Sequence, residues 1–463
     1  MAETSLAQHR FTLPEKSLIG LSCFLLFIWT VPGTIALRLA VTVVLLGLSF
    51  ACGVKSCGWP EIGKAFAEHR NIWLIYFALT LWIILEGALL GIHKQIVFRD
   101  IWGQWVRSGI CGLIGFMTAI AIMRRKPSNG GPTLAGVMAL TLAFQVGLHD
   151  IDTIWRWTTE GQLPFQETRI AANRTGISFV NNLLMALVSA ELLARILFKK
   201  QYVSLKTIWL TLIVGMCFFA TFVLGTRFGT LGFLALIISS ATVVLYAKRK
   251  SIHLGGFILI AAVTFTLIAT FAWASIKSDP RWLTFAETIT IAMDTENHSA
   301  WRDDSLPMPK LSNGVPAEES AYLRVAWAKE AILAILRDPF GVGFSRSAFG
   351  HAMQKLYPDY ASSLHCHSGI LNFTIGAGTP ALILWILLIG SLIVTGWRSF
   401  FQRQNPSGLL LLMLVTGFSI RSVVDGNMQD HMFEQFMFLS MMFLVLASAD
   451  LKSQPGQGIM PND

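Results

Sequence analysis

The chain has 463 residues, of which 54% are hydrophobic and only 14% are charged, whereas about 25% of the residues in an ordinary soluble domain are charged. This composition, which includes 32 Phe and 15 Trp, argues against a soluble enzyme and indicates a polytopic membrane protein. The formal net charge of +9 could indicate a nucleic-acid partner, but in a membrane protein an excess of basic residues usually reflects the orientation of the loops.

Twelve apolar segments are long enough to cross about 30 Å of hydrocarbon as helices. They lie at residues 17–32, 34–54, 71–91, 106–123, 132–149, 175–197, 206–225, 228–247, 252–275, 367–397, 408–424 and 433–449. Short glycine-containing turns join the first segment to the second and the seventh to the eighth, so each pair predicts a tight helical hairpin. The sequence therefore predicts an all-α polytopic fold in three parts: transmembrane helices 1–9 in residues 1–275, a large loop in 276–366, and helices 10–12 with a tail in 367–463.

Basic residues are unequally distributed over the connecting segments. With the N-terminus in the cytoplasm, seven short inner segments hold 18 Lys and Arg residues, and the short outer loops hold eight. This asymmetry predicts that both termini are cytoplasmic and explains the net charge without nucleic acid. The same orientation places the 276–366 loop outside, which in a bacterium is the periplasm.

The outer loop itself is predicted to contain helices. Residues 281–293 place aromatic and aliphatic side chains at helical spacing, as in a helix lying on a membrane surface. Residues 317–336 predict a second helix, with two glutamates in its first turn, where the helix dipole favours them. The segment Gly341-Val342-Gly343 then predicts a turn that returns the chain to the membrane.

Motifs of several common enzyme classes are missing from the sequence, among them a Walker lysine loop, a dinucleotide glycine fingerprint, a serine nucleophile elbow and an HExxH helix. The ionisable residues Arg38, Glu86 and Glu191 fall close to the ends of their spans, whereas an ion-coupled transporter needs such groups near the bilayer midplane. The spans are therefore interpreted as a scaffold, and the functional residues are expected at the outer face.

Four side chains on that face form the candidate site. Arg227 lies in the turn of the second hairpin, Arg174 precedes the sixth span, and Arg324 lies on the predicted loop helix. His367 ends the loop. Because guanidinium groups bind phosphate oxygens in bidentate fashion and are permanently charged, the arginines predict a pyrophosphate site. A neighbouring histidine can act as a general base near neutral pH.

Other interpretations of polar residues on this face remain open. Some arginines at helix ends are interpreted as lipid-headgroup anchors, the commonest role of such residues: Arg156, Arg169 and Arg421. His365 and His367 could bind a metal ion together. Asp150 and Asp152 could hold the divalent cation of a metal-dependent glycosyltransferase, although such carboxylates more often begin a solvated loop.

Three stretches resemble the C-terminal signature of the O-antigen ligase and polymerase superfamily. They are the residues DPFGVGF at 338–344, HSGILN at 367–372 and GAGTPA at 376–381. Arg174 with Asn181-Asn182, and Thr226-Arg227, resemble two further motifs, so that the resemblance covers roughly residues 170–390. The chain departs from the family pattern at Ser368, where Asn is common, and at Thr379-Pro380, which replace the usual second glycine.

The resemblance implies a GT-C-like membrane fold and a metal-independent, inverting glycosyl transfer from an undecaprenyl-pyrophosphate-linked glycan, with no cofactor. It implies His367, Arg227 and Arg324 as catalytic residues and Arg174, Arg227 and Arg324 as the site of the donor pyrophosphate.

Twelve spans with one large outer loop near the C-terminal end resemble the ligase. The ligase joins O-antigen to the lipid A-core acceptor at the periplasmic face of the bacterial inner membrane, where membrane lipids surround it. Polymerase is the alternative, although the paired arginine-to-glycine loop motifs typical of polymerases are missing. A lipid-linked glycan transporter would need a polar route through the spans, which the sequence does not show.

Overall fold

The computed structural model describes residues 11–125, 129–249, 254–278 and 284–449, most of which are helical. The helices are α2 (Leu13–Ile28), α3 (Ile35–Glu68), α4 (Arg70–Leu89), α5 (Lys94–Asp100), the π-helix η1 (Ile101–Val106), α6 (Arg107–Arg125), α7 (Gly130–Glu160), α8 (Arg174–Phe198), α9 (Thr207–Leu224), α10 (Arg227–Lys248), α11 (Leu254–Ser278), α12 (Phe285–Ala292), α13 (Glu319–Arg337), α14 (Ala348–Leu356), α15 (Gly369–Phe401), α16 (Pro406–Val424) and α17 (Asp430–Ser448). Within these ranges there is no β-strand, and the prediction of an all-α polytopic protein is confirmed.

Ten helical segments of the described chain are long and apolar enough to cross a membrane, where twelve were predicted. One of the ten is continuous over Lys94–Met123. The first predicted span is α2, whose 16 residues rise only about 24 Å, less than the hydrocarbon thickness. The ninth predicted span, 252–275, begins outside the described residues and corresponds to α11, of which the stretch Ala261–Thr270 is recognised as a shorter apolar helix.

Both predicted hairpins are present. The turn between α9 and α10 consists of Gly225 and Thr226, and Gly225 has a φ of +53°. A Cβ atom at Gly225 would lie 2.9 Å from the side chains of Phe165 and Gln166, so glycine suits both the backbone conformation and the space. The hydroxyl of Thr226 donates to Ser178 of α8 at 2.7 Å, which ties the turn to the centre of the bundle.

The fifth predicted span is longer than expected. Helix α7 continues to Glu160 and ends at Gly161, which has a φ of +72°. The predicted loop 150–174 is therefore shorter, and Asp150 lies inside a helix instead of at the start of a loop. The apolar run marked only the part of the helix that is rich in hydrophobic residues.

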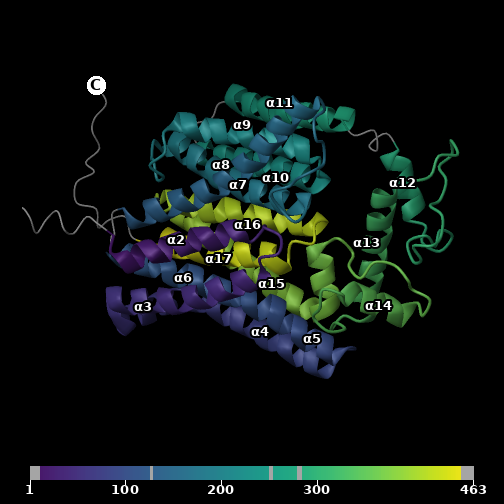
Figure 1. Ribbon diagram of the computed structural model, residues 1–463, viewed down its shortest axis with the longest axis horizontal. Helices are drawn as coiled ribbons and strands as arrows, with labels where there is room; N and C mark the ends of the chain where they lie inside the picture. The colour runs from purple at the N-terminus through teal and green to yellow at the C-terminus, as the bar shows by residue number, and fades with distance from the viewer. Residues whose placement is uncertain (1–10, 126–128, 250–253, 279–283, 450–463) are drawn as a thin grey trace, which may run out of the picture.

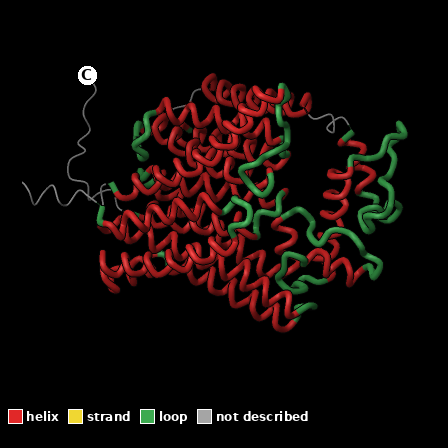
Figure 2. The backbone as a smooth tube through the Cα atoms, in the orientation of Figure 1, coloured by secondary structure: helices red, strands yellow, loops and turns green. Residues whose placement is uncertain are grey.

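The long helices form one bundle in which α17 packs on α6, α15 on α16, and α8 on α9, α10 and α16. Helices α12, α13 and α14 gather at one end of this bundle (Figure 1), and the longer loops lie mainly beside them (Figure 2). They have a small core of their own, which includes Trp301, Tyr322, Trp327 and Phe349.

The helices of the predicted outer loop largely match the sequence analysis. Helix α13 confirms the predicted helix 317–336, and its N-cap Glu318 accepts a hydrogen bond from the Ala321 amide at 2.6 Å. Helix α12 is shorter than the predicted 281–293, and residues 281–283 of that prediction lie outside the described residues. Helix α14 was not predicted.

The turn at residues 341–343 docks on a break in α15. Gly341 and Gly343 have φ values of +100° and +110°, and Gly378 has a φ of +81° within α15. The Gly343 amide donates to the Gly376 carbonyl at 3.0 Å and to the Glu86 carboxylate at 2.7 Å. A Cβ at Gly341 would lie 2.5 Å from the Gly376 carbonyl oxygen. The glycines of the two stretches thus allow the backbones to meet, which fixes the chain that leads to α14.

Candidate active site

Two of the predicted arginines begin neighbouring helices. Arg174 is the first residue of α8 and Arg227 the first residue of α10, and the two helices pack together. A cation at a helix N-terminus adds to the positive end of the helix dipole, so this region of the bundle has a positive potential. The charge of Arg227 is partly balanced by Glu318, whose Oε2 lies 3.1 Å from Arg227 Nη1. Glu318 therefore joins α13 to the start of α10.

Arg324 of α13 lies beside these groups. Its guanidinium covers the Phe228 ring at 4.6 Å from the ring centre, and its Nε is buried without a hydrogen-bond partner among the described residues. Burial lowers the pKa of Arg324, and the charges of Arg227 and Arg174 lower it further, whereas Glu318 and Asp425 oppose the change. The structure thus brings Arg227 and Arg174 within electrostatic reach of Arg324. Their mutual repulsion favours the binding of an anion.

His367 adjoins the same group. Its ring stacks on Trp327 at a centroid distance of 5.6 Å and lies 4.2 Å from the ring of His365. Burial lowers the pKa of His367 to about 3, and the nearby His365 and Arg324 contribute to the shift. The imidazole is therefore neutral at physiological pH and has a lone pair that can accept a proton. Its φ of +56° is unusual for a residue other than glycine.

The residues that follow His367 hold this conformation. Ser368 is the N-cap of α15, and its hydroxyl accepts from the Leu371 amide at 3.4 Å. Serine caps a helix as well as the asparagine common at this position of the family motif, so the departure leaves the cap intact. Asn372, one turn later, donates to the carbonyls of Ser345 and Arg346, each at 3.3 Å.

A pocket opens beside His367. Its volume is about 410 Å³, including space open to solvent. His365, His367 and Asn372 line one part of it, and Gln104 and Arg346 line another. The sequence analysis singled out neither of the last two residues, because they are far apart in the chain and belong to no motif.

The predicted role of Arg421 as a lipid-headgroup anchor is wrong. Its side chain is only 1% exposed, so it does not anchor a lipid headgroup. Its Nε donates to Asp425 at 2.7 Å, and its Nη1 donates to Ser178 at 3.2 Å and to Asn182 of α8. Arg421 therefore holds the first turns of α8, and its spacing of four residues from Asp425 is the sequence signal that indicates such an ion pair.

Arg156 also differs from the headgroup-anchor interpretation, whereas Arg169 is compatible with it. The Arg156 side chain is 10% exposed and forms ion pairs with Glu160 and Glu167, at 3.3 and 2.5 Å. The Arg169 side chain is 63% exposed.

The described residues do not form a cluster of metal ligands at either of the alternative metal sites. Among the described residues, no group of three or more His, Cys, Asp and Glu side chains gathers where it could hold a metal ion. Asp150 is 6% exposed, so the solvated loop start expected for it is wrong. His149 beside it is fully buried.

Comparison with known families adds an independent finding. Residues 211–386 match the family model described as O-antigen ligase. The match begins in α9 and ends in α15, and it includes Arg227, Arg324 and His367 but neither Arg174 nor Arg421. No curated protein shows a significant match to the chain.

Proposed function

We propose that this chain, of which residues 211–386 match the O-antigen ligase family model, transfers O-antigen from undecaprenyl pyrophosphate to the lipid A-core oligosaccharide. The reaction would take place at the periplasmic face of the bacterial inner membrane. The observation that carries the proposal is the position of helix α13, on which Arg324 lies over Phe228, the neighbour of Arg227, and Trp327 stacks on His367.

In the proposed reaction, the acceptor hydroxyl attacks the anomeric carbon of the donor sugar and His367 takes up its proton. The bond between that carbon and the pyrophosphate oxygen breaks with inversion, and undecaprenyl pyrophosphate leaves with the bonding electron pair. Arg227, Arg324 and Arg174 stabilise the charge that develops on the leaving group. Three fixed cations can do this without a divalent metal ion, so we propose that the transfer is metal-independent.

The low pKa of His367 fits this sequence of events. A base with a pKa of about 3 is weak at neutral pH. When the donor pyrophosphate binds, its negative charge offsets that of Arg324, which raises the pKa of His367. The base would therefore become stronger once the donor is in place, which limits the activation of water in the empty site.

The decisive experiment is transfer by purified protein in lipid nanodiscs, with lipid-linked O-antigen as donor and lipid A-core as acceptor. Arg227→Ala should lower the rate by about 100-fold or more, the usual loss when one group that stabilises developing charge is removed. Arg227→Lys should restore part of the rate, because it keeps the charge and loses the bidentate geometry. Arg169→Ala is the control, because that arginine is 63% exposed.

Two further measurements separate the alternatives. Wild-type activity should persist in a strong chelator, and His367→Ala should lose far more activity than His365→Ala or Asp150→Ala. Because Arg227→Ala removes the ion pair between Arg227 and Glu318, the thermal unfolding of each variant has to be compared with that of the wild type. A product in which the lipid-linked glycan is lengthened, while lipid A-core stays unmodified, would identify a polymerase and refute the ligase.

A further inference from the structure

The pocket beside His367 has a wall that the proposed donor site does not use. Arg346 lines it together with Gln104, Asn372 and Gln429, whereas the lining includes none of the three donor-site arginines among the described residues. Phe344 and Phe373 give it an apolar part. The pocket therefore joins the candidate base to a separate set of polar groups.

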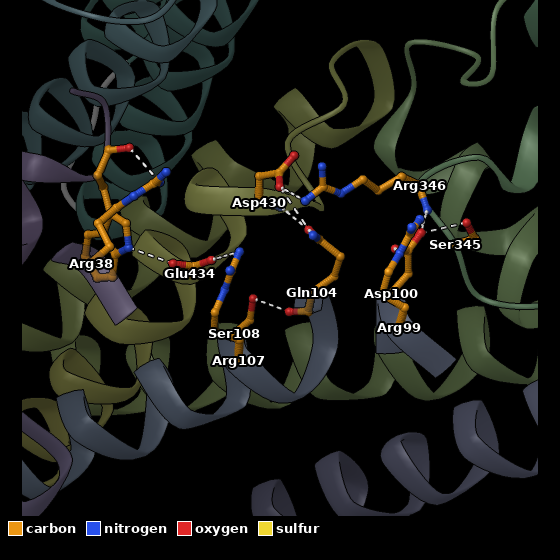
Figure 3. Close-up of polar contacts among 11 residues, drawn as sticks. Arg38, Arg99, Asp100, Gln104, Arg107, Ser108, Ser345, Arg346, Asp430 and Glu434 are labelled. Carbon is orange, nitrogen blue, oxygen red and sulfur yellow. Dashed lines mark hydrogen bonds and ion pairs between the residues drawn. The ribbon is translucent and has the colours of Figure 1, made fainter. Parts of the chain in front are cut away.

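Arg346 is held in this wall from three directions. Its amide donates to the Asp100 carboxylate at 3.0 Å, and its carbonyl accepts from Asn372 at 3.3 Å. Its guanidinium forms an ion pair with Asp430 through Nη2 (Figure 3). The side chain nevertheless remains 48% exposed. Because a guanidinium has five N–H groups, most of them remain available to a ligand in the pocket.

The partner of Arg346 is itself fixed. Gln104 of η1 is buried, its Oε1 accepts from the Asp430 amide at 2.5 Å, and its Nε2 donates to Asp430 Oδ1 at 3.3 Å. This double contact holds Asp430 at a φ of +53° at the start of α17. The π-helical turn of η1 widens the helix at Gln104, and such turns often occur at functional sites.

One turn further along α17, a second ion pair secures the helix. Glu434 is 2.5 Å from Arg107 Nη2 and accepts from the Trp29 indole at 2.7 Å. Arg38 donates to the Trp29 carbonyl at 3.0 Å. Figure 3 shows this row of charges leading from Arg38 toward Arg346. Contacts from η1 and α6 thus hold α17, which carries Asp430, beside the pocket.

Groups of these kinds suit a sugar that carries a negative charge. Amide side chains both donate to and accept from hydroxyl groups, and a preorganised guanidinium binds phosphate or carboxylate oxygens. A base must lie within hydrogen-bond reach of the acceptor hydroxyl. Because His367 lines this pocket, an acceptor sugar bound there would present its hydroxyl to the base.

We propose that this pocket binds the acceptor sugar, and that Arg346 binds a phosphate or carboxylate group on it while Asp430 and Gln104 position Arg346. The inference rests on the proposed function, since it assigns the second substrate of the same site.

The test compares acceptor kinetics of the wild type and Arg346→Gln in nanodiscs. Loss of one charge-assisted contact should raise the acceptor KM by about 10- to 100-fold, with the donor KM unchanged and kcat within a few-fold. Arg346→Lys should recover part of the affinity. Lys355→Gln is the matched control, because Lys355 is 49% exposed and is also ion-paired, with Asp338 at 2.7 Å.

The source of the negative charge is found by changing the acceptor. Two altered acceptors are used, one dephosphorylated and one whose carboxyl groups have been reduced. The affinity of the wild type should fall for the acceptor that lacks the group contacted by Arg346. Arg346→Gln should then cause no further loss with that acceptor. Equal and independent losses from the variant and from both altered acceptors would overturn the proposal, as would a fall in kcat with an unchanged acceptor KM.

A second readout keeps this test apart from the proposed function. Binding of isolated core oligosaccharide to the nanodisc protein, without donor, should be weaker for Arg346→Gln than for the wild type. If the wild type lengthens lipid-linked glycan and leaves lipid A-core unmodified, the ligase proposal fails, and the same kinetic comparison is made with lipid-linked glycan as acceptor. Undiminished acceptor affinity of Arg346→Gln in both measurements would refute the pocket assignment alone.

Discussion

The pH dependence of transfer tests the environment of His367 directly. With a pKa of about 3, the imidazole is only about 1% protonated at pH 5, whereas a histidine with the ordinary pKa of about 6.5 is about 97% protonated. If His367 is the base and has the ordinary pKa, kcat/KM should fall about 30-fold between pH 7.5 and pH 5. If its pKa is about 3, kcat/KM should stay almost unchanged over this range. We expect a flat profile over this range.

The assay is initial-rate transfer in nanodiscs from pH 8 to pH 4.5, analysed separately as kcat/KM and kcat. The first reports the free enzyme and the second the substrate complex. Since bound pyrophosphate offsets the charge of Arg324, the acid limb of kcat should lie at higher pH than that of kcat/KM. In Arg324→Gln, which removes one cause of the shift, the limb of kcat/KM should also move to higher pH.

Folding must be followed in the same experiment. Below pH 6.5 the unfolded chain binds a proton at this histidine and the native chain does not, so stability falls with decreasing pH by up to about 1.4 kcal/mol per pH unit until the native pKa is reached. Thermal unfolding at each pH separates this loss from catalysis. The buried, neutral state of the base would be refuted by a 30-fold fall of kcat/KM by pH 5 under conditions in which the protein stays folded. The residual rate of His367→Ala must not show the same fall.

Two other predictions concern the framework of the site, and a third concerns the topology. Arg421→Met should lower the free energy of unfolding by about 3–5 kcal/mol, because it leaves the buried Asp425 carboxylate without its cation. Gly343→Ala should also destabilise the protein, because Gly343 has a φ of +110° and a Cβ there would lie 2.4 Å from a side chain of α5. Gly390→Ala is the control and should leave the stability unchanged, because no atom lies within 4 Å of a Cβ at that position. Both are measured by thermal unfolding. A cysteine at Asn313 should react with an impermeant thiol reagent added outside intact cells, and protection there would contradict the proposed topology.

The sequence predicts the helices well where hydrophobicity alone determines them. Long apolar runs mark the bundle, Gly225 marks the second hairpin, and the glutamates at 318 and 319 mark the start of α13. The end of α7 is missed because its last turns are mixed in polarity, although helical hydrogen bonding continues to Glu160. The short helix α14 has no apolar run to announce it.

The site divides in the same manner. Arg174, Arg227 and His367 can be singled out from the sequence because each stands at a helix end or in a recognisable motif, and Arg324 because it lies on the predicted loop helix. Arg346, Gln104 and Asp430 cannot, since their roles arise from contacts between distant segments: Gln104 and Asp430 are 326 residues apart, and Arg346 and Asp100 are 246 residues apart. The burial of Arg421 is likewise a tertiary effect, as a basic residue near the end of an apolar run most often faces the headgroups.

Helix α13 connects the two halves of the proposed chemistry. Its N-cap Glu318 pairs with Arg227 of α10, and Trp327 near its middle stacks on His367. Arg324 lies three residues before Trp327 and therefore on the same side of the helix. A displacement of α13 relative to α10 would change both the positive charge around the donor pyrophosphate and the burial that keeps His367 neutral. The donor site and the base thus depend on the docking of a single helix, so a variant that loosens α13 should weaken donor binding and raise the pKa of His367 together.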